Sequence, residues 1–176
     1  FGMLDLILAI LADIEFTLWA DSHSSIQIIR RIWLKIHNVS FDKKVFIGKN
    51  VYLRGQGRLV IGNRTSIGSF SRIWKYSDIT IGEDFMSAGA LTINTGGHDP
   101  QTMEPFSKPI LIGNRVWCGM NVTILPGIKI GDDVVIAAGC IVTKDVPPGV
   151  VVAGIPGKVI RKLEKRDYSH FWRPKW

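Results

Sequence analysis

Cysteine, histidine and long apolar runs are all scarce in this 176-residue sequence. Its two cysteines, Cys118 and Cys140, cannot form a disulfide framework, and neither belongs to a CxxC pair that would bind a metal. No stretch approaches about 18 uncharged apolar residues, so no transmembrane helix is expected. The apolar segment 1–20 also lacks the basic start and the small-residue cleavage site of a signal peptide. These absences predict a protein of the reducing cytoplasm.

The sequence does have enough apolar residues for a core, together with an excess of positive charge. Hydrophobic residues make up 46% of the chain, which predicts one globular domain. The net charge is +7, and residues 158–176 contain seven Lys and Arg. A basic terminus can contact nucleic acid, an acidic membrane surface or a phosphorylated ligand, or it can simply be solvated.

The strongest signal is an internal repeat with a period of six residues. An apolar or small residue recurs at every sixth position in the series Ile112, Cys118, Ile124, Ile130, Ile136 and Val142. Earlier registers run from Ile47 to Leu59 and from Ile61 to Ile79, and a glycine often follows the repeated residue. A helix would repeat at 3.6 residues and an antiparallel strand at 2. We therefore predict short strands and turns, with six residues on each of three faces, stacked into a prism of roughly five coils spaced about 4.8 Å apart.

The repeated Ile-Gly-x-x-Val unit, over about residues 45–163, resembles the hexapeptide-repeat acyltransferases. That family folds as a left-handed parallel β-helix. The resemblance implies an all-β solenoid of this kind over residues 41–160, preceded by a helical segment (1–40) and followed by a basic C-terminal extension (161–176).

The six-residue register lapses in the polar, turn-rich segment 94–111, which contains His98, the only histidine within the repeats. Loops expelled from a rigid scaffold often carry function. Here Gly96-Gly97-His98 precedes Ile112-Gly113-Asn114-Arg115-Val116-Trp117, and specific matches continue to Arg161. This arrangement resembles the galactoside/maltose O-acetyltransferase branch, which places its catalytic base in an equivalent Thr-Gly-His loop. The resemblance implies that His98 accepts the proton of a sugar hydroxyl as it attacks the thioester of acetyl-CoA.

The same resemblance implies the other parts of an acetyl-transfer site. Backbone N–H groups at Gly119 and Met120 would stabilise the oxyanion, and either Asp99 or Glu104 would orient the imidazole. The expected cosubstrate is acetyl-CoA, with no metal. Its predicted contacts are the aromatic Trp117, the small Ala138 and Gly139, and the phosphate-binding set Thr143, Lys144, Lys158 and Arg161.

The acceptor is predicted less directly. The branch carries an Asn and an Asp in the coil before the histidine, where this chain has Gly68 and Tyr76. A small galactoside or maltose is therefore not expected, and we predict a glycan or sugar intermediate of cell-surface polysaccharide synthesis. The stretch offers Ser71 and Lys75 among its polar groups, and the predicted acceptor-binding residues are Ser69, Arg72, Trp74, Tyr76 and Asn94.

Alternatives remain for the chemistry and for the N-terminus. A nucleotide-sugar N-acetyltransferase would use the same base and cofactor, and a non-catalytic β-helix binding protein would share the prism. A metal-dependent hydratase needs three converging histidines, and the repeats supply one. Two helices, 1–20 and 24–37, are expected to pack on the prism or to contact a membrane surface. The family implies a homotrimer, and no nucleic-acid partner is expected.

Overall fold

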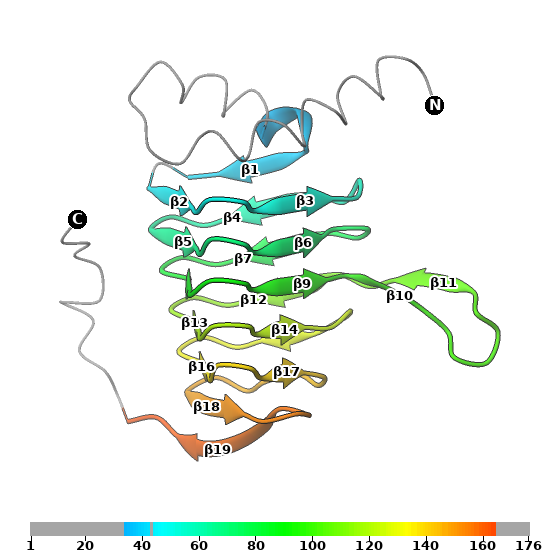
Figure 1. The fold of residues 1–176 in the computed structure, drawn as a ribbon. Helices are drawn as coiled ribbons and strands as arrows, with labels where there is room; N and C mark the ends of the chain where they lie inside the picture. Colours follow the sequence, from blue (N-terminus) through cyan, green and yellow to red (C-terminus); the bar gives the residue numbers. More distant parts are fainter. Residues whose placement is uncertain (1–33, 43, 165–176) are drawn as a thin grey trace, which may run out of the picture.

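The computed structural model describes residues 34–42 and 44–164. Three columns of short strands form the faces of a triangular prism (Figure 1). Face A contains β1 (Val39–Phe41), β4 (Leu59–Ile61), β7 (Ile79–Ile81), β12 (Ile110–Ile112) and β15 (Lys129–Ile130). Face B contains β2 (Val45–Ile47), β5 (Thr65–Ile67), β8 (Met86–Ser87), β13 (Trp117–Cys118), β16 (Val135–Ile136) and β18 (Val150–Ala153). Face C contains β3 (Tyr52–Arg54), β6 (Arg72–Trp74), β9 (Thr92–Asn94), β14 (Thr123–Ile124) and β17 (Ile141–Val142).

Every pairing within these three faces is parallel, and the chain visits the faces in the order A, B, C. Viewed from its N-terminal end, the chain turns anticlockwise as it moves away, so the coil is left-handed (Figure 1). The six parallel strands of face B make about six turns, one more than predicted. An antiparallel strand, β19 (Lys158–Lys162), closes face B against β18. The predicted left-handed parallel β-helix is confirmed.

The core is a stack of aliphatic side chains, one from each strand. On face C, for example, Ile73, Ile93 and Ile124 lie in register, and all three are fully buried. Cys118 and Cys140 are also buried, and burial raises the pKa of each thiol. Both cysteines are therefore core residues, because a protonated, inaccessible thiol behaves as a small apolar side chain.

The coils are not all of one length, which corrects the prediction of a uniform repeat. Val39 pairs with Leu59 and Leu59 with Ile79, a coil of 20 residues, whereas Leu111 pairs with Lys129, a coil of 18. The extra residues lie where face C turns into face A, which we call the C–A corner. Four residues turn this corner in each of the first two coils (55–58 and 75–78), two lie between the equivalent positions in the fourth (126–127), and a long excursion leaves it after β9. Figure 1 shows these segments projecting on one side of the prism.

Little of the N-terminal helical segment falls within the described residues. Residues 34–36 are helical, and Leu34 is buried in the core cluster at the end of the prism. This contact agrees with a helix that packs on the prism. The predicted helix 1–20, most of 24–37 and residues 165–176 of the C-terminal extension lie outside the described residues. Within the described part of the chain, no helix has the length and hydropathy needed to cross a membrane.

Candidate active site

A hollow of about 660 Å³ opens at the C–A corner, between the prism and the excursion that follows β9. Part of its wall comes from the ends of three successive strands, because Arg54, Trp74 and Asn94 are paired in register on face C. The rest of the wall comes from Tyr76 and from a projecting hairpin. The full lining is Arg54, Trp74, Tyr76, Asn94, Gly96, Gly97, His98, Pro105, Phe106 and Ser107. Its volume is in the range typical of small-molecule sites.

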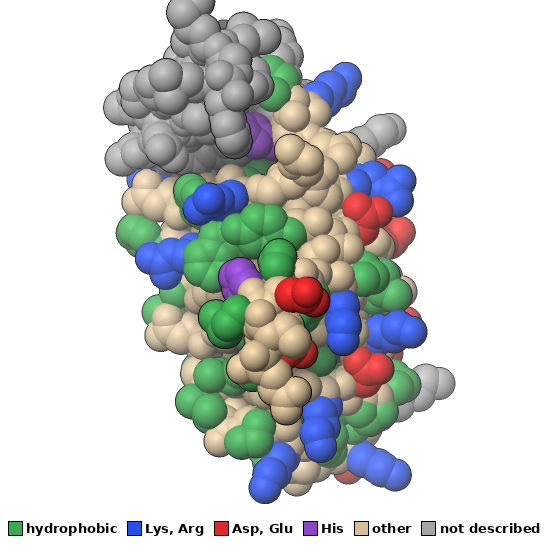
Figure 2. Space-filling view, turned by 90° about the vertical axis from the view of Figure 1, so that its right-hand side faces the viewer, with side chains coloured by type: hydrophobic (Ala, Val, Ile, Leu, Met, Phe, Trp, Pro, Cys, Tyr) green, Lys and Arg blue, Asp and Glu red, His purple; other side chains and the backbone are tan. Residues whose placement is uncertain are grey.

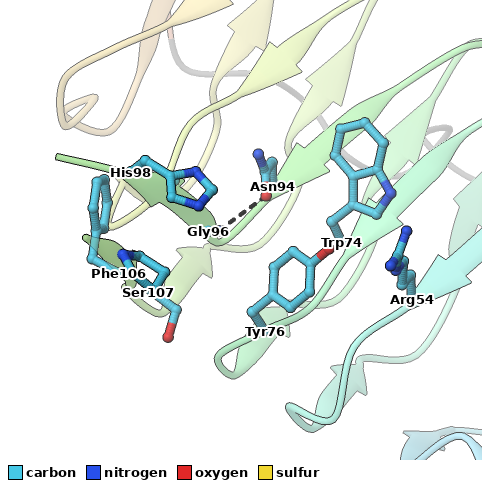
Figure 3. Close-up of a pocket in the computed structure, with 10 residues that line it drawn as sticks. Arg54, Trp74, Tyr76, Asn94, Gly96, His98, Phe106 and Ser107 are labelled. Carbon is cyan, nitrogen blue, oxygen red and sulfur yellow. Dashed lines mark hydrogen bonds between the residues drawn. The ribbon is translucent and has the colours of Figure 1, made fainter. Parts of the chain in front are cut away.

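The hairpin consists of β10 (Gly96–His98) and β11 (Pro105–Ser107), which pair antiparallel with His98 opposite Pro105. Its base is fixed by Asn94, whose side-chain oxygen accepts a hydrogen bond of 2.9 Å from the Gly96 N–H. In Figure 3 the imidazole of His98 lies on the Asn94 side of the hollow. Figure 2 faces the hairpin and shows hydrophobic side chains gathered around a histidine. The strand therefore presents an exposed imidazole to a hollow that three aromatic rings, Trp74, Tyr76 and Phe106, help to line.

The tip of the hairpin is shaped by Asp99. Its carboxylate accepts hydrogen bonds from the backbone N–H groups of Gln101 (2.8 Å) and Thr102 (3.0 Å). These bonds favour the charged form and hold the pKa of Asp99 below its usual range. Of the two acidic residues considered for orienting the imidazole, Asp99 is thus already engaged by its own turn.

Two glycines allow aromatic rings to lie against the hairpin backbone. A Cβ placed on Gly96 would lie 2.6 Å from Cδ2 of Tyr76, and one on Gly97 would lie 2.8 Å from Cζ of Phe106. Both separations are shorter than real carbon–carbon contacts, so any side chain would displace a ring. The Gly-Gly-His sequence is therefore explained by the two rings that form the walls beside His98.

Beneath this wall, Lys75 ties two corner turns together. Its side chain is almost fully buried, and its Nζ donates to the carbonyl oxygens of Gly55 (2.6 Å) and Gly57 (2.9 Å). Burial disfavours the charged form and lowers the pKa of Lys75, although the nearby Asp78 carboxylate opposes this shift. Considered from the sequence as a group for the acceptor, Lys75 instead supports the turns that carry Arg54, Trp74 and Tyr76.

The predicted acceptor residues divide into two groups. Trp74, Tyr76 and Asn94 line the hollow together with His98. Ser69 and Arg72 do not: Ser69 Oγ accepts a hydrogen bond from the Lys49 N–H at another corner, and Arg72 is exposed on β6. Ser71 does not line the hollow either, because its side chain is buried and its hydroxyl donates to the Gly68 carbonyl oxygen.

Four of the lining residues were not predicted individually: Arg54, Pro105, Phe106 and Ser107. The last three lie within the loop 94–111 that was predicted to be catalytic, whereas Arg54 was missed altogether. The signal for Arg54 was the two-residue shift between the early registers, Ile47–Leu59 and Ile61–Ile79. That shift puts segment 54–58 at the same corner as the histidine hairpin.

The residues predicted for the oxyanion and the thioester lie near the corner between faces B and C. Trp117 and Met120 are exposed, by 42% and 56% respectively. The Gly119 N–H, however, donates to the Ile136 carbonyl (2.8 Å), and a Cβ on Gly119 would lie 2.6 Å from the Ala138 nitrogen. Gly119 is therefore required for stacking of the coils. Within the described residues the Met120 N–H makes no hydrogen bond, so it is the donor left for an oxyanion.

The remaining predicted cofactor residues are exposed or partly exposed on the last two turns. Ala138 and Gly139 follow β16, and Gly139 has φ of +72° with open space beside it. Thr143 and Lys144 follow β17 at the C–A corner, whereas Lys158 and Arg161 lie on β19 of face B. Within one chain, His98 and the Trp117–Met120 turn are thus on opposite sides of face C, which is roughly 10 Å wide given strands of about 3.3 Å per residue.

Comparison with known proteins identifies the family of the chain. The profile of the family described as bacterial transferase hexapeptide (six repeats) matches residues 109–144. Over 139 residues the chain is 37% identical to galactoside O-acetyltransferase of Escherichia coli K12, covering 76% of this chain and 62% of that enzyme. Over 138 residues it is 31% identical to the putative lipopolysaccharide biosynthesis O-acetyl transferase WbbJ of the same strain, covering 70% of this chain and 68% of that protein.

A solved structure, galactoside acetyltransferase in complex with coenzyme A, is 31% identical and superposes with a TM-score of 0.63, covering 96% of this chain and 85% of that one. The chain spans less than two thirds of the length of the galactoside enzyme of E. coli. It nevertheless matches WbbJ over more than two thirds of that protein, at above 30% identity. Together with the β-helix and its histidine hairpin, these similarities show that the chain belongs to the hexapeptide-repeat acetyltransferases.

Proposed function

We propose that this chain transfers the acetyl group of acetyl-CoA to a hydroxyl of a saccharide, with His98 as the general base. The observation that carries the proposal is the placement of one exposed imidazole in a hollow whose other walls are aromatic rings and polar side chains. A ring nitrogen of His98 takes the hydroxyl proton while the oxygen attacks the thioester carbonyl. The tetrahedral intermediate then collapses, and the departing CoA sulfur receives that proton from the imidazolium.

The acceptor is proposed to be a sugar of a cell-surface glycan. Trp74, Tyr76 and Phe106 offer apolar ring surfaces for a saccharide ring, while Asn94 and Ser107 offer hydrogen bonds. The similarity to a protein named for lipopolysaccharide biosynthesis supports this class over a free disaccharide. The test is release of CoA with formation of an acetyl ester across a panel of glycan fragments, free disaccharides and amino sugars. Reaction only at an amine would overturn the proposal in favour of N-acetyl transfer.

We assign the cofactor phosphates to the exposed cations at the end of the prism. Replacing Lys144 and Arg161 together by alanine is expected to raise the Kd of CoA by at least about 100-fold, because each charge-assisted hydrogen bond contributes about 1.5–3 kcal/mol. Calorimetric titration with CoA measures the change. Lys129→Ala, which removes an exposed lysine from β15 on face A, is the control. A loss of CoA affinity in Lys129→Ala as large as in the double variant would mean that general charge, rather than this site, binds the cofactor.

A homotrimer is proposed because one chain keeps the parts of the site apart. His98 projects from the C–A corner and the Met120 N–H from the corner between faces B and C. In a cyclic trimer the C–A corner of each chain can face the corner between faces B and C of its neighbour. This arrangement completes three equivalent sites. The oxyanion donor and Trp117 would then act on substrate held beside the neighbour's His98.

Complementation tests this shared site. His98→Ala and Trp117→Ala are each expected to lower activity at least tenfold. The co-expressed population of trimers is expected to recover about a quarter of wild-type activity, because random assembly pairs two intact halves at that frequency. The measurement is turnover after co-expression of the two variants. Mixed trimers without recovered turnover would place the whole site within one chain.

A further inference from the structure

We propose that the acceptor carries an anionic group, a carboxylate or a phosphate, which Arg54 binds while a neighbouring hydroxyl reaches His98. This inference rests on the proposed function and names its substrate class. None of the residues that line the hollow is acidic, and Arg54 brings to it a fixed positive charge at one end. In Figure 3, Arg54 and His98 lie at opposite ends, with Trp74 and Tyr76 between them.

Three other arginines of the coils are structural cations, and Arg54 is not one of them. Arg64 bonds Asp84 in the next coil at 2.6 Å, Arg115 bonds Asp133 at 2.7 Å, and Arg58 bonds Asp78 at 3.2 Å. These pairs connect successive coils at the corners. Among the described residues, neither Arg54, at the end of β3, nor Arg72 has such a partner, and of these two only Arg54 lines the hollow. A guanidinium is suited to bidentate binding of a carboxylate or a phosphate. We therefore infer that an anionic ligand is the partner of Arg54.

The turn that carries Arg54 is held in a fixed place. Lys75 binds the carbonyl groups of Gly55 and Gly57 from below, and the Arg58 N–H donates to Asp78 (2.9 Å). These bonds tie the first corner turn to the second, so they set Arg54 relative to Trp74. Burying the Lys75 ammonium against two carbonyl groups costs free energy. We attribute this cost to the need to hold Arg54 in a fixed position for recognition.

The spacing suits a sugar ring with one charged substituent. Arg54 and Asn94 are two rungs apart on face C, roughly 10 Å at about 4.8 Å per rung. A pyranose ring can lie across Trp74 and Tyr76 in this span, with its anionic group at Arg54 and a ring hydroxyl at His98. A uronic acid supplies a carboxylate and a sugar phosphate supplies a phosphate, and the guanidinium accepts either geometry.

The test compares three probes that share a galactose ring: methyl galactoside (neutral), methyl galacturonide (carboxylate) and galactose 1-phosphate. For the wild-type protein we expect kcat/KM for at least one anionic probe to exceed that for the neutral probe by tenfold or more, and the favoured probe identifies the anion. Arg54→Gln is expected to remove this preference while changing the neutral probe less than twofold. Arg58→Gln removes the same charge from the same turn outside the hollow, and it is expected to keep the preference.

Calorimetric binding of the same probes separates this inference from the proposed function. If no acetyl transfer occurs but an anionic probe binds and Arg54→Gln abolishes its binding, the charge assignment stands and the proposed reaction fails. Equal use of neutral and anionic probes overturns the inference, as does loss of all three substrates together in Arg54→Gln. A loss of CoA affinity in that variant would assign the guanidinium to the cofactor and also overturn it.

Discussion

Replacing His98 by alanine is expected to lower kcat for acetyl transfer by about 100- to 10,000-fold, the usual contribution of a positioned general base. The side chain is exposed on β10, and its backbone pairing with Pro105 does not depend on the imidazole. The hairpin should therefore keep its shape, and the Kd of acetyl-CoA should change less than twofold. Turnover is measured by release of the CoA thiol, and binding by calorimetry.

Two further variants make the His98 result specific. His98→Gln retains a polar side chain of similar size but has no nitrogen able to accept the proton, so it should lose as much activity as the alanine variant. Gln101→Ala changes an exposed residue at the tip of the same hairpin and should retain full activity. Near-normal turnover in either His98 variant would remove the histidine from the reaction and leave the hairpin only as a wall of the hollow.

The fold was predictable because the same six-residue pattern recurs along the whole β-helix. Each turn needs one inward aliphatic side chain per face, and residues such as Ile61, Ile67 and Ile73 occupy these places at six-residue intervals within a coil. The handedness came from the resemblance to the family, since no spacing specifies it. The number of residues per coil was not predicted, because the two early registers were treated as separate runs instead of one run interrupted at a corner.

The candidate site was predictable only where it lies on the chain segment around the histidine. Asn94 belongs to the histidine segment, and Trp74 and Tyr76 were found because the resembled branch carries acceptor residues in the coil before it. Arg54 belongs to one coil earlier still and reaches the hollow only through stacking. Lys75 misled for a different reason. A lysine is rarely buried, so Lys75 was expected to be available to the acceptor. No local sequence pattern predicts that its amine binds the carbonyl groups of Gly55 and Gly57.

The division of the proposed site between two corners also has a physical origin. His98 and Met120 are 22 positions apart in the sequence numbering, but they are separated by face C, because the chain leaves the C–A corner, crosses faces A and B and then turns again. Sequence spacing gives the separation of two residues along the chain, but it does not show at which corner of the prism each residue lies. Only strand register, which places Asn94 beside Trp74 and Trp117 beside Met86, reveals which groups share a corner.

Replacing Ile93 by alanine is expected to lower the free energy of unfolding by about 2–5 kcal/mol, the range for truncating a fully buried aliphatic side chain. Ile93 lies between Ile73 and Ile124 in the central stack, so a cavity there weakens contacts with the coils on both sides. For a chain of this size the loss corresponds to a fall in Tm of roughly 4–20 °C, measured by thermal unfolding. Thr92→Ala, a change to the partly exposed residue before it on β9, should alter Tm by much less. Because each coil is stabilised by its neighbours, the Ile93 variant should still unfold in one transition. Two separated transitions would mean that the coils before and after β9 fold independently. The hairpin would then be attached at the boundary between two folding units.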